Sequence, residues 1–88
     1  MDKMSTTVKT LIDRQMTLVA LEAQAYAMLQ EQQKAYLEMA MIIPEAGTIL
    51  SGITMMAAHK SMELDCHQKV LEALKRLYKD VKEVEDAE

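Results

Sequence analysis

Residues 41–48 read MIIPEAGT, and this stretch decides the fold. It holds the single proline of the chain, Pro44, and one of its two glycines, Gly47. Proline disfavours the helical conformation in the residue before it, and a Pro/Gly cluster marks a turn. We therefore expect a turn at about residues 44–47. An alternative places Pro44 in the first helical position after the turn, with the Glu45 carboxylate in a favourable place at the helix N-terminus.

The segments on both sides of this turn show helical spacing. Before the turn, apolar residues recur three or four positions apart from Val8 to Ile43, which is one face of an α-helix. After the turn, two sets of residues repeat every seven positions. These are Leu50, Ala57, Leu64, Leu71 and Tyr78, and Ile53, Lys60, His67, Leu74 and Val81. The spacing predicts helices over about 6–43 and 48–84, followed by an acidic tail at 85–88, in one domain spanning 1–88.

Two helices of this length joined by a short turn fold back on each other. The predicted fold class is all-α, an antiparallel two-helix hairpin. A turn centred at 45–46 would place Glu22 beside Lys69. The apolar stripe at residues 16–29 is wider than one interhelical seam can cover. We therefore expect the helical hairpin to pair into a four-helix bundle or coiled-coil oligomer, with a homodimer favoured.

Composition excludes several other classes. Half of the 88 residues are apolar, with nine Met and no Phe or Trp. So few Gly and Pro exclude an all-β fold, which needs frequent turns, and one Cys excludes a disulfide framework. The net charge of −4 makes nucleic acid an unexpected partner. Residues 1–7 lack the apolar core of a signal peptide, so a cytoplasmic location is expected, with leaderless export left open.

One cluster has metal-ligand chemistry: His59, Glu63, Cys66 and His67. Neighbours at i,i+4 can share a metal, but His59 and His67 lie about 12 Å apart along a helix axis. The first helix offers no matching Glu-x-x-His motif. We therefore expect neither a metal nor another cofactor, and His59, Glu63 and His67 remain the candidate ligands if one binds. No nucleophile–base arrangement is evident, so no enzymatic activity is expected.

The sequence predicts a non-enzymatic protein–protein interaction module, such as a small adaptor, chaperone or inhibitor, with a protein partner whose identity the residues do not give. Its candidate partner or oligomer interface comprises the widened helix stripe and an apolar hairpin tip. These residues are Leu18, Val19, Ala23, Tyr26, Ala27, Ile42, Ile43, Ile49, Leu50, Ile53 and Met56. The alternatives are an assembly subunit that functions as a homo-oligomer, a membrane-active hairpin using the apolar 39–58 stretch, and a metal-responsive helical protein. Pro44 and Glu45 within that stretch argue against membrane insertion.

Overall fold

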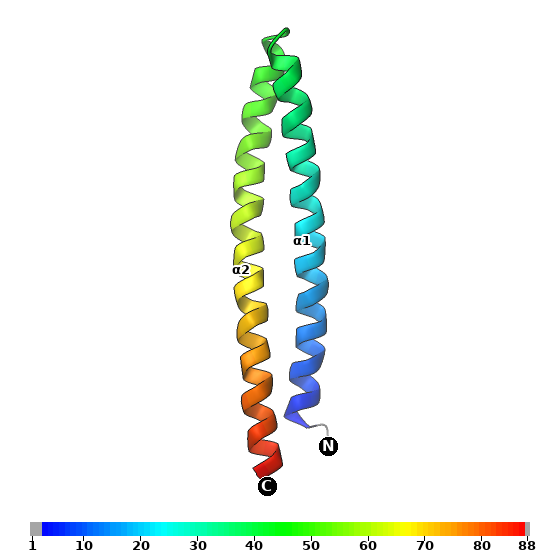
Figure 1. Ribbon diagram of the computed structural model, residues 1–88, viewed down its shortest axis with the longest axis vertical. Helices are drawn as coiled ribbons and strands as arrows, with labels where there is room; N and C mark the ends of the chain where they lie inside the picture. Colours follow the sequence, from blue (N-terminus) through cyan, green and yellow to red (C-terminus); the bar gives the residue numbers. More distant parts are fainter. Residues whose placement is uncertain (1–2, 88) are drawn as a thin grey trace.

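The computed structural model describes residues 3–87 and confirms an all-α helical hairpin (Figure 1). Helix α1 (Met4–Ala40) has 37 residues and helix α2 (Glu45–Ala87) has 43 residues. The two helices lie side by side and antiparallel, so that the start of α1 and the end of α2 both lie at the end of the rod opposite the turn. The molecule is a rod of 69 × 16 × 14 Å. Because the rod is only two helices thick, most of the surface of each helix is exposed.

The turn comes earlier than the sequence predicted. Helix α1 ends at Ala40 rather than near residue 43, because the N–H groups of Ile42 and Ile43 both donate to the carbonyl of Met39 and close its last turn. Helix α2 begins at Glu45 rather than near 48. Pro44 directly precedes it, and its carbonyl accepts the N–H of Gly47 at 2.9 Å. Glu45 therefore lies in the first turn of α2, as the alternative expected, whereas Pro44 lies one position before the first helical residue and not in it.

The far ends also differ from the prediction. Helix α1 begins at Met4 rather than near residue 6, and residues 85–87 continue helix α2 instead of forming a tail. Met1, Asp2 and Glu88, at the limits of the predicted domain and tail, lie outside the described residues.

A single seam joins the helices. Its positions repeat at alternating spacings of three and four, which is the heptad pattern of a coiled coil. From α1 they are Ser5, Val8, Ile12, Gln15, Val19, Glu22, Tyr26, Leu29, Gln33, Tyr36 and Ala40. From α2 they are Ala46, Leu50, Ile53, Ala57, Lys60, Leu64, His67, Leu71, Leu74, Tyr78, Val81 and Glu85. Both predicted seven-residue repeats of the second helix therefore face the first.

This seam is a thin core. The buried apolar residues are Val8, Ala46, Ile53 and Ala57, and within residues 3–87 no large side chain is fully buried. Polar side chains occupy several seam positions, and their hydrogen bonds and ion pairs across the seam fix which residues of the two helices face each other. Gln15 donates to the backbone carbonyl of His67 at 2.8 Å, and Lys60 lies 3.1 Å from Glu22. The predicted Glu22–Lys69 contact is wrong because the turn is centred nearer residues 42–43 than 45–46. Lys69 instead pairs with Asp65 on its own helix.

The open end of the hairpin is held by Ser5 and Glu85. The Ser5 backbone N–H donates to Glu85 Oε1 at 2.9 Å, and the Ser5 hydroxyl donates to Oε2 at 2.6 Å. The first four N–H groups of a helix have no partner within it, and a carboxylate there also favours the helix dipole. Lys3, at the N-cap position, makes no side-chain cap. Glu85 from helix α2 therefore supplies the cap of helix α1.

These two hydrogen bonds, first that from the Ser5 hydroxyl and then that from its backbone N–H, lower the pKa of Glu85 from its ordinary value of 4.5. A lowered folded-state pKa gives stability that is present above the unfolded-state pKa and is lost as the pH falls through the folded value. We call the Ser5–Glu85 contact the clamp. It therefore stabilises the hairpin at neutral pH, and this stabilisation is lost in acid.

Replacing the clamp carboxylate tests this account. We expect Glu85→Gln to lower the melting temperature at pH 7 by a few degrees, whereas Glu83→Gln on the same helix leaves it unchanged. The deficit of Glu85→Gln should begin to shrink as the pH falls below about 4.5, and it should vanish below the lowered folded-state pKa, where wild type has lost its carboxylate too. Circular dichroism melts from pH 3 to 7 measure both effects. Equal melting of the two variants at pH 7 contradicts the clamp.

Candidate functional site

An ionic cluster crosses the seam near the middle of the rod. The Lys60 ammonium lies 3.1 Å from Glu22 Oε2 on helix α1 and 3.3 Å from Glu63 Oε2 on its own helix. The Glu22 oxygen is buried and has no well-aligned hydrogen-bond donor, so the closeness of the charges carries this contact. Contact with Glu22, and then with Glu63, raises the pKa of Lys60, and Lys60 in turn lowers the pKa of Glu63. Lys60 therefore stays charged at neutral pH.

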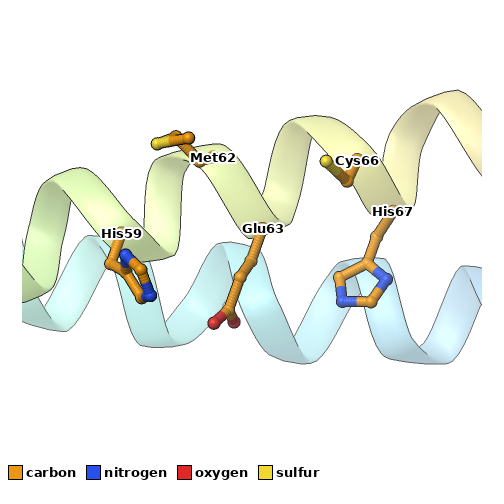
Figure 2. A pocket seen from close by; sticks show the side chains of 5 residues that line it. All are labelled: His59, Met62, Glu63, Cys66 and His67. Atoms are coloured by element: carbon orange, nitrogen blue, oxygen red, sulfur yellow. The ribbon is translucent and has the colours of Figure 1, made fainter.

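The predicted metal-ligand residues line a hollow of about 320 Å³ beside this cluster. In Figure 2 the side chains of His59, Glu63 and His67 point the same way from helix α2, while Met62 and Cys66 lie on another side of that helix. All five lining residues belong to α2. Within residues 3–87 no three His, Cys, Asp or Glu side chains converge as metal ligands. Glu63 is engaged by Lys60 instead.

A second stripe of apolar side chains runs along each helix beside the seam. On α1 it consists of Leu11, Leu18, Leu21, Ala25, Met28 and Met39. On α2 it consists of Ile49, Met56, Val70, Leu77 and Val84. Each of these residues directly precedes a seam residue, as Leu11 precedes Ile12 and Leu77 precedes Tyr78. For most of them, that seam residue occupies the same one of the two seam positions of the heptad. One residue turns an α-helix by about 100°, which places them to one side of the seam.

The two stripes form one surface of the hairpin. The helices run in opposite directions, so the same offset from the same seam position points to the same side in both. We call this surface the apolar face, comprising the eleven residues of the two stripes. Most of its large members are exposed, with 57% for Leu21, 57% for Met28 and 58% for Met56, whereas Leu18 is half-buried. Arg14, Gln32, His59, Glu63 and Asp80 are its polar interruptions.

The opposite side of the hairpin is different. On α2 it carries Thr54, Ser61, Gln68, Lys75 and Lys82, with no large apolar side chain among them. On α1 the corresponding positions hold Met16 and Leu37 among polar residues and alanines. A single hairpin therefore leaves one apolar side and one largely polar side in contact with water.

The tip of the hairpin is a further exposed apolar surface. Met41 is 80% exposed and Ile42 is 84% exposed in the connection between the helices, with Ile43 beside them. Connections are normally polar, because they run over the surface. We call Met41, Ile42 and Ile43 the apolar tip.

The predicted interface residues fall into different places. Val19, Tyr26, Leu50 and Ile53 lie in the seam of the hairpin itself. Leu18, Ile49 and Met56 belong to the apolar face, and Ile42 and Ile43 to the apolar tip. Ala23 and Ala27 are exposed on the opposite side, away from both surfaces.

The interface residues named from the sequence did not include Leu21, Met28, Met39, Leu77 and Val84, although the predicted stripe at 16–29 spans the first two. The apolar face of α2 could have been recognised from a further seven-residue repeat, one position before the repeat that begins at Leu50. This repeat is Ile49, Met56, Glu63, Val70, Leu77 and Val84. Within the described part of the chain, neither helix contains a stretch that is both long and apolar enough to cross a membrane.

Comparison with protein-family models, curated proteins and solved structures finds no match for this chain.

Substitutions in the ionic cluster test how the Glu22–Lys60 contact affects the thermal stability of the hairpin. Lys60→Leu leaves Glu22 in the seam without its cation, and we expect a clear loss in melting temperature. The double variant Glu22→Leu/Lys60→Leu extends the apolar seam and should melt at or above the wild-type temperature. Lys69→Leu, which removes the exposed Lys69–Asp65 pair, is the matched control and should change little. Thermal melts that rank the double variant below Lys60→Leu contradict this account.

Proposed function

We propose that this protein is a non-enzymatic protein–protein interaction module, of the kind used as an adaptor, chaperone or inhibitor, and that it acts through the apolar face and the apolar tip. The observation that carries the proposal is the amount of large apolar surface left in water. Met41 and Ile42 at the tip are 80% and 84% exposed, and the apolar face runs along both helices. Contiguous exposed apolar surface on a small protein marks an interaction site.

The shape of the chain supports the same proposal. A rod of 69 × 16 × 14 Å has little concave volume for a substrate, but it presents side chains at helical spacing over its full length. The hollow lined by His59, Glu63 and His67 is open, and its carboxylate is already paired with Lys60. The molecule thus offers surfaces for docking more readily than a site for chemistry.

The apolar tip is the surface best placed to reach a different protein, because it projects from the end of the rod where both helices stop (Figure 1). The charged residues nearest to it are Glu38 and Glu45, both acidic. Anionic lipid is therefore a poor match, and an apolar pocket with a neutral or basic rim is a good one.

A tip variant tests this function. Ile42→Asp/Ile43→Asp should abolish capture of the protein partner from an extract of the source cells, with helicity unchanged because neither side chain lies in the seam. Met16→Asp/Leu37→Asp, at side chains 51% and 52% exposed on the opposite side of the hairpin, is the control and should capture the partner as wild type does. Quantitative mass spectrometry of the captured proteins is the readout. Undiminished capture by the tip variant, or binding only to phosphatidylcholine vesicles, contradicts the proposal.

A further inference from the structure

We infer that the apolar face is covered by a second copy of this chain, so that two hairpins pack face to face into a four-helix bundle and leave both apolar tips free. This inference rests on the proposed function, since it names the partner of one of its two surfaces. The tip would then serve a different protein.

The exposed area of the single hairpin is the first argument. Its accessible surface is 6764 Å², whereas a compact monomeric protein of 10.0 kDa exposes about 5,200 Å². The excess is about 1,500 Å² per chain. Two copies that each buried this excess would form an interface of about 3,000 Å², within the range of obligate homodimers. One additional copy is therefore enough to bring the chain to the exposure of an ordinary folded protein.

The arrangement of the face is the second argument. Helices in a four-helix bundle use the two seam positions of each heptad and one flanking position, and here that flanking position is the apolar one on both helices. The two stripes also match in length. Leu11 and Val84 lie toward the open end, and Met39 and Ile49 lie next to the turn. A two-fold symmetric pairing places identical faces together, so the same stripes serve both copies.

The third argument comes from two hollows near the middle of the apolar face. Two hollows lie there, one of about 320 Å³ and one of about 200 Å³, and His59 and Glu63 line both. The second hollow is lined by Leu29 of helix α1 as well as by Met56, so it opens between the two helices. Hollows flanked by Met side chains, which adapt their shape, can accept apolar side chains from a facing surface. The carboxylate of Glu63 already has Lys60 as its cation.

Sedimentation equilibrium of the full chain tests the inference. Wild type should have a mass of about 20 kDa, twice the 10.0 kDa of one chain. Leu21→Glu/Met28→Glu on the apolar face should shift it to the mass of one chain. Met16→Glu/Leu37→Glu is the matched control. It introduces the same charges on the same helix, at side chains 51% and 52% exposed on the opposite side, and should remain a dimer.

Milder variants keep the test decisive if the doubly charged face variant loses its helical signal. Leu21→Gln should raise the dissociation constant about tenfold or more, because one buried Leu side chain is lost from each copy. Leu37→Gln should leave it unchanged. A wild-type mass of one chain overturns the inference, as do equal effects of the Leu21 and Leu37 variants. Neither result bears on capture by the apolar tip, so failure here is distinct from failure of the proposed function.

Discussion

A pair of antiparallel helices can cover only one stripe on each helix, and the rest of this structure follows from that constraint. Both helices carry a seam of heptad residues and, one position before it, a second apolar stripe. The hairpin buries the seam alone. Its core is consequently thin, with Val8, Ala46, Ile53 and Ala57 as its buried apolar residues. The uncovered stripe lies on one side of the rod, and this arrangement is the basis of the proposed pairing with a second copy.

The polar side chains in the seam have a different role. A continuous apolar seam can slip by one heptad, and polar contacts at fixed positions restrict such slippage. Gln15 with the His67 carbonyl, Glu22 with Lys60 and Ser5 with Glu85 join the helices at three separated heights. The Ser5–Glu85 contact also caps helix α1. We interpret these contacts as setting which residues face each other, while apolar burial provides most of the stability.

Much of this fold could be predicted from the sequence, because the hairpin depends on local signals. Pro44 and the heptad spacing gave two antiparallel helices, and the predicted repeats contained every seam residue of α2 except Ala46 and Glu85. The turn was placed too late, since the backbone hydrogen bonds that end α1 at Ala40 leave no mark in side-chain pattern. That error displaced the register and produced the wrong partner for Glu22. The apolar face was only partly recognised, because Leu21 or Leu77 can be assigned to a side only after the seam is known.

The central claim is that one hairpin does not bury enough apolar surface to stand alone. Its most direct test is the melting temperature of wild-type protein over a hundredfold range of concentration, followed by circular dichroism. Folding coupled to association makes the melting temperature depend on concentration, so it should rise steadily with concentration. A melting temperature that stays constant over the whole range would show a hairpin that is stable as a single chain, and would contradict the account.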